Sequence, residues 1–202
     1  MDAAGGATVS GSVSWYAVNE KLLSFALMYL AAAAPPAFQL RDTQGVVHTP
    51  AEWAGHRAVV LFFVTTDCPI ANSYVPEMNR IRDAYAPRGV LFYAVQAEPR
   101  TPEAEVARYA REYRYTFPLL LDPHHVLVKL TGATITPQAA VVTPEGKLLY
   151  LGRIDNRAVD FGVQRPRATE QDLREALDAV LAGRSVPHAF TKSIGCAIPR
   201  IE

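Results

Sequence analysis

Residues 57–76, RAVVLFFVTTDCPIANSYVP, combine a hydrophobic run, a polar turn and a cysteine followed by a proline. The run Val59–Val64 consists of β-branched, aromatic and leucine side chains, which is typical of a strand buried on both faces. The polar residues 65–67 end it. Because proline is favoured at the first position of a helix, Pro69 predicts a helix start with Cys68 as its N-cap.

An N-cap position has direct chemical consequences for Cys68. Free amide groups of the first turn and the positive end of the helix dipole face such a side chain. These surroundings favour the thiolate, which is the reactive form of cysteine. Asp67 opposes this effect, because a neighbouring carboxylate disfavours a second negative charge. Cysteine is also among the most frequently buried residue types, so a structural thiol is the alternative interpretation.

Composition narrows the possible functions of the 202-residue chain. Lys plus Arg and Asp plus Glu number 20 each, so neither a nucleic-acid partner nor a polybasic membrane patch is indicated. The two cysteines, Cys68 and Cys196, are too few for a disulfide scaffold. No Cys/His grouping has the spacing of a zinc site. We therefore expect neither a metal nor a cofactor.

The first 35 residues differ from the rest of the chain. Residues 22–34, LLSFALMYLAAAA, carry no charge, follow Lys21 and end in small residues before two prolines. This run is short for a bilayer span and is typical of a signal peptide. We interpret residues 1–35 as a leader, which implies an exported, periplasmic or extracytoplasmic protein without a stable membrane span after leader removal. The alternative is an extra helix on a cytoplasmic domain.

Strand and helix patterns alternate after residue 35. Strand patterns cover residues 37–40, 46–48, 58–64, 90–95, 117–121, 138–142 and 148–151, and helix patterns cover residues 69–85, 101–113, 122–132 and 169–183. Thr169 is expected to cap the last helix, and Arg153 and Asp155 to form an ion pair within an irregular connection. Alternation implies parallel crossovers, to which the final hairpin adds antiparallel strands. We predict an α/β domain over residues 36–187, with a central mixed β-sheet and helices on both faces, and a C-terminal tail over residues 188–202.

Several short motifs occur along this domain in a fixed order. They are TDCP at 66–69, FP at 117–118, TP at 136–137, GRID at 152–155 and GCAI at 195–198. With these motifs the chain resembles the thioredoxin-like superfamily. Within it, the chain is most similar to the redoxin, or peroxiredoxin-like, branch of the alkyl hydroperoxide reductase and thiol-specific antioxidant group. The resemblance implies a thioredoxin-like fold and an antioxidant or thiol oxidoreductase role in cell redox homeostasis.

The resemblance also implies roles for individual residues. Cys68 takes the nucleophile position, and Pro76 matches the proline inside the active-site helix of thioredoxins. Pro137 matches a proline that is cis in these folds and packs against the reactive cysteine. Only about 5–6% of X-Pro bonds in folded proteins are cis, so this expectation depends on the resemblance. The supporting site residues implied are Thr65, Thr66, Pro69, Thr136 and Pro137.

Two departures from the family pattern narrow the chemistry. Ala71 stands where a C-x-x-C protein has its second cysteine, which excludes a local disulfide. In the peroxiredoxin pattern P-x-x-x-T-x-x-C, Thr65 fits the threonine but Leu61 replaces the proline. Peroxidase activity is therefore less expected than disulfide exchange.

The second cysteine, Cys196, lies thirteen residues beyond Gly183. An extended segment of that length reaches roughly 43 Å, so the tail is long enough to bring Cys196 to Cys68. A resolving cysteine, a structural disulfide and a free tail thiol all remain open. We predict a thiol-dependent oxidoreductase that reacts with a redox partner protein or a peroxide. The alternative is a non-enzymatic binding or assembly module that uses the same fold.

Overall fold

The computed structural model of the chain describes residues 36–201. The predicted leader lies outside these residues. No helix in the described part is long and apolar enough to cross a membrane.

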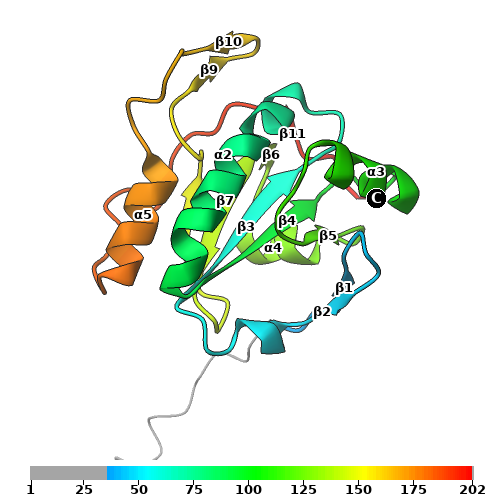
Figure 1. The fold of residues 1–202 in the computed structure, drawn as a ribbon, viewed down its shortest axis with the longest axis horizontal. Helices are drawn as coiled ribbons and strands as arrows, with labels where there is room; N and C mark the ends of the chain where they lie inside the picture. Colours follow the sequence, from blue (N-terminus) through cyan, green and yellow to red (C-terminus); the bar gives the residue numbers. More distant parts are fainter. Residues whose placement is uncertain (1–35, 202) are drawn as a thin grey trace, which may run out of the picture. The chain divides into compact units, whose positions relative to one another are not determined.

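A five-stranded sheet in the order β5-β4-β3-β7-β8 forms the centre of the domain (Figure 1). Its strands are β3 (Ala58–Val64), β4 (Val90–Gln96), β5 (Leu119–Leu121), β7 (Gln138–Val142) and β8 (Leu148–Gly152). Strands β3, β4 and β5 run parallel, whereas β7 is antiparallel to β3 and β8 is antiparallel to β7. The mixed sheet predicted from the sequence is thereby confirmed.

Helices cover both faces of this sheet, as predicted. The helical elements are η1 (Pro50–Trp53), α2 (Pro69–Tyr85), η2 (Ala86–Arg88), α3 (Glu103–Glu112), α4 (Val126–Thr131) and α5 (Asp172–Leu181). Side chains of α2, α3 and α5 pack in one core cluster, and those of η1 and α4 pack in a second cluster on the opposite face. Figure 1 shows α2 and α5 side by side in front of the sheet.

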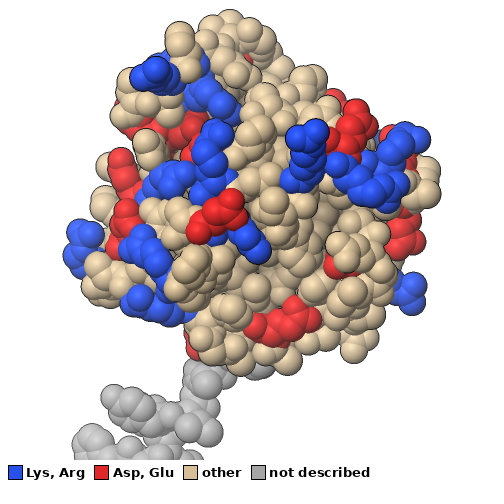
Figure 2. Space-filling model, in the orientation of Figure 1, with Lys and Arg blue, Asp and Glu red and all other residues tan. Residues whose placement is uncertain are grey.

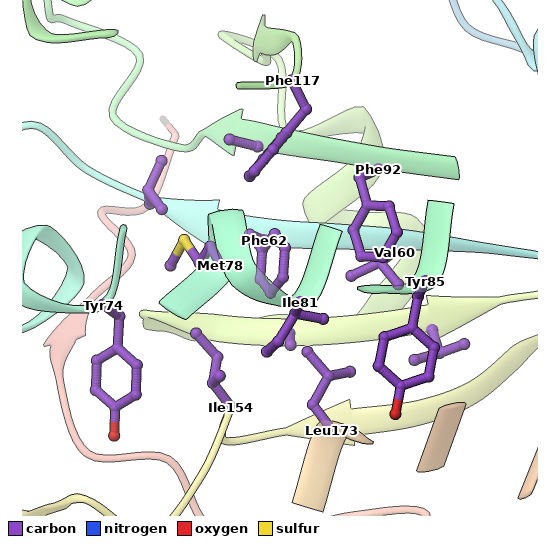
Figure 3. Close-up of a cluster of buried hydrophobic side chains, with 14 of the residues drawn as sticks. Val60, Phe62, Tyr74, Met78, Ile81, Tyr85, Phe92, Phe117, Ile154 and Leu173 are labelled. Carbon is purple, nitrogen blue, oxygen red and sulfur yellow. The ribbon is translucent and has the colours of Figure 1, made fainter. Parts of the chain in front are cut away.

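Strand β3 lies at the middle of both clusters, and all seven of its residues are buried. Val60, Phe62 and Val64 belong to the α2 cluster, and the alternate residues Val59, Leu61 and Phe63 belong to the α4 cluster. The continuous apolar run follows from this two-sided burial. Figure 3 shows the α2 cluster, with aromatic side chains from the sheet stacked under the helix.

Helix α2 has the apolar stripe that its sequence predicts. The five stripe residues Ile70, Tyr74, Met78, Ile81 and Tyr85 are all buried. The helix continues through Pro76, which is exposed. Cys68 is the N-cap, with Pro69 as the first helical residue, so the predicted helix start is confirmed.

Short strand pairs complete the described part. They are β1 (Leu40–Arg41) with β2 (Val47–His48), β9 (Ala158–Asp160) with β10 (Val163–Gln164), and β6 (Ile135–Thr136) with β11 (Cys196–Ala197), all antiparallel. The β9–β10 hairpin occupies a connection that we expected to be irregular. It projects away from the sheet beyond the start of α2 (Figure 1).

Two local predictions in this region were wrong. The N-cap of α5 is Gln171, without a side-chain cap, while the Thr169 hydroxyl accepts a hydrogen bond from the Asn156 amide at 2.7 Å. Arg153 pairs with Asp172 at 2.8 Å and with Glu170, not with its neighbour Asp155. In both cases a partner distant in sequence replaces the local one.

Candidate functional site

The sulfur of Cys68 lies fully buried at the start of α2. The Ala71 amide donates to Sγ at 3.5 Å, which is the contact expected of an N-cap side chain. On its other side, the Cys68 thiol donates to the carbonyl oxygen of Thr136 at 3.0 Å. The sulfur is therefore held between one hydrogen-bond donor and one acceptor.

The segment that supplies this carbonyl contains a cis peptide bond between Thr136 and Pro137, as the sequence resemblance predicted. Both residues are buried. The Thr136 hydroxyl also lies 3.3 Å from the hydroxyl of Thr65, which is itself buried at the end of β3. Four of the predicted site residues, Thr65, Cys68, Thr136 and Pro137, are thus brought together at one point.

The C-terminal tail brings Cys196 to the same point. In the β6–β11 pair Cys196 stands opposite Thr136, and the Thr136 hydroxyl donates to the Cys196 carbonyl at 3.5 Å. The Cys196 side chain packs against the core cluster that contains Cys68, and both cysteines are free thiols. Gly195 permits this close pairing, since a Cβ there would lie 2.0 Å from the Thr136 oxygen.

The Cys196 thiol is held in its protonated form. Burial and the nearby Cys68 and Asp67 side chains together raise the pKa of Cys196 to about 12. Of these causes, burial is the largest.

The remaining predicted residues lie at the edge of the site. Pro69 is exposed, and Thr66 contributes its carbonyl, which accepts a hydrogen bond from the Asn72 amide at 3.2 Å. Ala71 is fully buried next to the sulfur, and Leu61 packs in the opposite core cluster, away from Cys68. Within residues 36–201, no group of three His, Cys, Asp or Glu side chains is placed to hold a metal ion.

A hydrogen-bonded group of side chains behind Cys68 was missed by the sequence reasoning. Asn72, one turn into α2, accepts from the Tyr109 hydroxyl at 2.9 Å and donates to the Tyr113 hydroxyl at 3.2 Å. The hydroxyls of Tyr109 and Tyr115 lie 3.0 Å apart. Burial raises the pKa of Tyr109, and so does the charge of Cys68, which places this group within electrostatic reach of the sulfur. The close spacing of the tyrosines in the sequence was its only signal.

Sequence comparison places residues 31–151 within the AhpC/TSA family. The thiol-disulfide oxidoreductase ResA of Geobacillus thermodenitrificans is 27% identical over 113 residues, which are 56% of this chain and 63% of that protein. The chain thus aligns with less than two thirds of the length of this curated relative.

Solved structures share the fold over a longer stretch. A hypothetical protein from Sinorhizobium meliloti is 30% identical, with a TM-score of 0.69 over 82% of this chain and 92% of its own. The exposed lipoprotein thioredoxin of Streptococcus pneumoniae is 21% identical, with a TM-score of 0.54 over 70% of this chain and 97% of its own. The fold is therefore thioredoxin-like, as predicted.

Proposed function

The chain belongs to the AhpC/TSA family, and we propose that it is a thiol-dependent oxidoreductase in which Cys68 is the nucleophile and Cys196 the resolving cysteine. One observation carries the proposal. Both cysteines meet at Thr136 beside the cis Thr136–Pro137 bond, Cys68 through the Thr136 carbonyl and Cys196 through the β6–β11 pair, although 127 residues separate them in the sequence. The name of the ResA relatives, thiol-disulfide oxidoreductase, supports the same reaction class.

The proposed reaction consists of two thiol-disulfide exchanges. The Cys68 thiolate attacks one sulfur of a substrate disulfide, forms a mixed disulfide with it and releases the other sulfur as a thiolate. Cys196, as thiolate, then attacks the Cys68 sulfur, forms the Cys68–Cys196 disulfide and releases the second substrate sulfur. The substrate disulfide is reduced by two electrons and the cysteine pair is oxidised by the same two. A dithiol of a redox partner protein restores the pair by the reverse exchanges.

The charges at the site support this order of events. In the reduced protein, burial and the nearby Cys68 raise the pKa of Cys196 and keep this thiol protonated. Cys68 is therefore the thiol that attacks the substrate first. Once Cys68 is in the mixed disulfide, its negative charge is gone and Cys196 loses its proton more readily. Because Cys68 is fully buried, the substrate must first displace a neighbouring segment. The β11 tail is the segment we assign to this movement, since Cys196 is only half-buried.

Disulfide exchange fits the site better than peroxide reduction. A peroxide pocket of the peroxiredoxin type uses a threonine and a proline near the reactive cysteine. Thr65 is in place, but the residue at the proline position, Leu61, is fully buried in the core cluster that does not include Cys68. This chain therefore shows the threonine of that pocket without the proline.

We further propose that the protein is exported and meets its redox partner outside the cytoplasm. The uncharged run at 22–34 supports export, and an oxidising compartment favours formation of the cysteine pair. Fractionation of cells expressing the full chain tests this proposal. Recovery of the uncleaved chain in the cytoplasmic fraction would contradict it.

Trapping of the mixed disulfide tests the assignment of the two cysteines. The reduced protein is mixed with oxidised glutathione, quenched with acid and analysed by mass spectrometry. We expect the wild type to lose the mass of two hydrogen atoms, as the Cys68–Cys196 disulfide. Cys196→Ser should instead retain one glutathione on Cys68, and Cys68→Ser should react slowly or not at all.

Two other outcomes would overturn parts of this assignment. If Cys68→Ser reacts as fast as the wild type, Cys68 is not the nucleophile. If the wild type accumulates the mixed disulfide as Cys196→Ser does, Cys196 is not a resolving cysteine. Capture of a sulfenic acid on Cys68 at substoichiometric hydrogen peroxide, with rapid turnover, would reverse our preference for disulfide exchange.

A further inference from the structure

A cavity of about 330 Å³ lies between α2, α5 and the connection that carries the β9–β10 hairpin. Four arginines and two carboxylates line it: Arg80, Arg157, Arg167, Arg174, Glu77 and Asp155. We propose that this cavity binds a small soluble oxyanion, a molecule that carries phosphate or carboxylate groups. The site is separate from Cys68, and the proposal does not depend on the proposed redox function.

The two carboxylates of the cavity already have partners. Glu77 receives hydrogen bonds from Arg80 at 2.7 Å and from Arg174 at 2.8 Å. Asp155 receives them from the Tyr74 hydroxyl at 2.6 Å and from a backbone amide at 2.8 Å. The lining therefore carries two more positive than negative charges. Both carboxylates are already hydrogen-bonded, and neither forms an ion pair with Arg157 or Arg167.

Arg157 and Arg167 are the arginines without a carboxylate partner. The Arg157 guanidinium lies over the ring of Tyr74, with Cζ at 4.2 Å from the centroid, and donates from Nη2 to the Ser73 carbonyl. Its Nε is buried and has no hydrogen-bond partner in the described part of the chain. Arg167 forms no ion pair or hydrogen bond with any described residue. A buried donor without a partner is costly, and an anion in the cavity would offset that cost.

The geometry also limits the kind of ligand. A guanidinium presents a planar fork of donors that matches the two oxygens of a carboxylate or phosphate group. The cavity volume is at the lower end of the range for small-molecule pockets, roughly 300–1,000 Å³. Figure 2 shows that Lys and Arg side chains gather over α5, the adjoining part of α2 and the hairpin. A positive surface of this kind attracts anions toward the cavity.

Calorimetric titration of the full chain tests the site with two probes, inorganic phosphate and citrate, at low ionic strength. We expect saturable binding of at least one probe with one site per chain. A preference for phosphate would indicate a phosphorylated ligand, and a preference for citrate a polycarboxylate. Binding should weaken as salt is added, because surface charges are screened.

Variants of Arg167 distinguish this cavity from general attraction to a basic surface. Arg167→Ala should weaken binding about tenfold, the effect of losing about one charge-assisted hydrogen bond, and Arg167→Glu should abolish it. The control is Arg108→Ala, an exposed arginine on α3 outside the cavity, which should bind as the wild type does. The proposal is overturned if neither probe binds saturably, or if Arg108→Ala weakens binding as much as Arg167→Ala.

Discussion

At the scale of single residues, the chemistry of the site depends on the atoms around one sulfur. The first-turn amide of Ala71 faces the Cys68 sulfur, as expected of an N-cap, but the Thr136 carbonyl faces it too. The carbonyl belongs to the cis Thr136–Pro137 segment and to the strand pair with Cys196. One backbone segment therefore connects Cys68, the cis proline and the second cysteine.

The raised pKa of Cys196 yields a prediction about its reactivity. Burial is the largest cause, and the nearby Cys68 side chain adds to it. Cys68→Ala removes the contribution of Cys68, so the pKa of Cys196 should fall below its present value of about 12. Below the pKa, each unit of decrease multiplies the thiolate fraction by about ten. Iodoacetamide should therefore alkylate Cys196 faster in Cys68→Ala than in the wild type at about pH 9.

Site-resolved mass spectrometry of the alkylated peptides provides the measurement. Cys68→Ser is the matched control, because its hydroxyl keeps a hydrogen-bonding group at the site but carries no charge. Its rate of Cys196 alkylation should lie between those of the other two proteins. Equal rates in all three would mean that Cys68 does not influence the Cys196 thiol.

A second residue-scale feature is the buried imidazole of His48. Its two ring nitrogens lie 2.7 Å from Glu52 and 3.1 Å from Asp42, and the Tyr93 hydroxyl donates to Glu52 at 2.6 Å. Burial lowers the pKa of His48, but hydrogen bonds and charges of both carboxylates outweigh it, so the pKa lies above 6.5. For Asp42 and Glu52, burial raises the pKa but is outweighed in the same way, so these values lie below 3.8 and 4.5.

These directions predict a window of maximal stability for the His48 contacts. The contribution of His48 is fully present below pH 6.5 and is lost as the pH rises through its raised pKa. The contributions of Asp42 and Glu52 are present above pH 3.8 and 4.5 and are lost as the pH falls through their lowered pKa values. His48→Gln should therefore cost most between pH 4.5 and 6.5, by about 2 kcal/mol in the free energy of unfolding. The Glu52 side chain is 39% exposed, so solvent screening weakens its share.

Urea unfolding of wild type and His48→Gln across the pH range checks this window. The difference between the two proteins should shrink on both sides of it. The control is His124→Gln, since His124 is exposed and lies outside this group of side chains. A difference that stays constant from acid to alkaline pH would contradict the assigned protonation states.

At the scale of elements, the two-residue strand β11 is the segment that we propose opens to admit a substrate to Cys68. It pairs with β6 through Cys196 and Ala197, and Ile194 and Cys196 pack against the core cluster that contains Cys68. A strand this short has few hydrogen bonds, and such elements open at a lower free energy than the core does. The tail is therefore suited to open for a substrate while the sheet stays intact.

Gly195→Ala tests the role of this pairing. The added methyl group would lie 2.0 Å from the Thr136 carbonyl oxygen, so the tail must move away from β6. If the substitution destabilises the paired position of the tail by about 1 kcal/mol, the population of molecules with an open tail and an exposed Cys68 rises about fivefold. We expect Cys68 to be alkylated at least that much faster in Gly195→Ala, with oxidation to the Cys68–Cys196 disulfide impaired.

The neighbouring variant Ala197→Ser is the control for this experiment, because Ala197 is exposed in the same strand. It should behave as the wild type in both assays. If Gly195→Ala leaves the alkylation rate of Cys68 unchanged, the tail does not restrict access to the sulfur.

Elements with strong local patterns were predicted well, and those set by distant contacts were not. The bounds of β3 and the start of α2 follow from hydrophobic run length, the stripe of apolar residues and the Cys68-Pro69 pair. The cap at Thr169 failed because Asn156, thirteen positions away, takes its hydroxyl. Sequence spacing showed only that Cys196 could reach Cys68, since the path of the tail depends on its pairing with β6.

At the scale of the whole molecule, the cysteine pair connects the start of α2 with the end of the chain. The core cluster on the α2 side is continuous from the sheet to α5 (Figure 3). Cys68 belongs to this cluster, and Cys196 packs against it. A Cys68–Cys196 disulfide would close a loop of more than 100 residues across it. In the chain-entropy model, closing a loop of that size lowers the entropy of the unfolded chain and thereby stabilises the fold by about 4.7 kcal/mol.

The oxidised protein should therefore be more stable than the reduced protein. For a domain of this size, about 4–5 kcal/mol corresponds to an increase of roughly 10 °C in Tm. Calorimetry of the protein after treatment with oxidised or reduced dithiothreitol measures this increase, and Cys196→Ser should show the same Tm after both treatments.

The disulfide stabilises the fold by the same free energy by which the fold stabilises the disulfide, so a large increase in Tm means that the disulfide is hard to reduce. Such a pair donates electrons, which favours reduction of substrate disulfides as the direction of exchange. A lower Tm in the oxidised protein would reverse this conclusion and make the chain an oxidant of its partners.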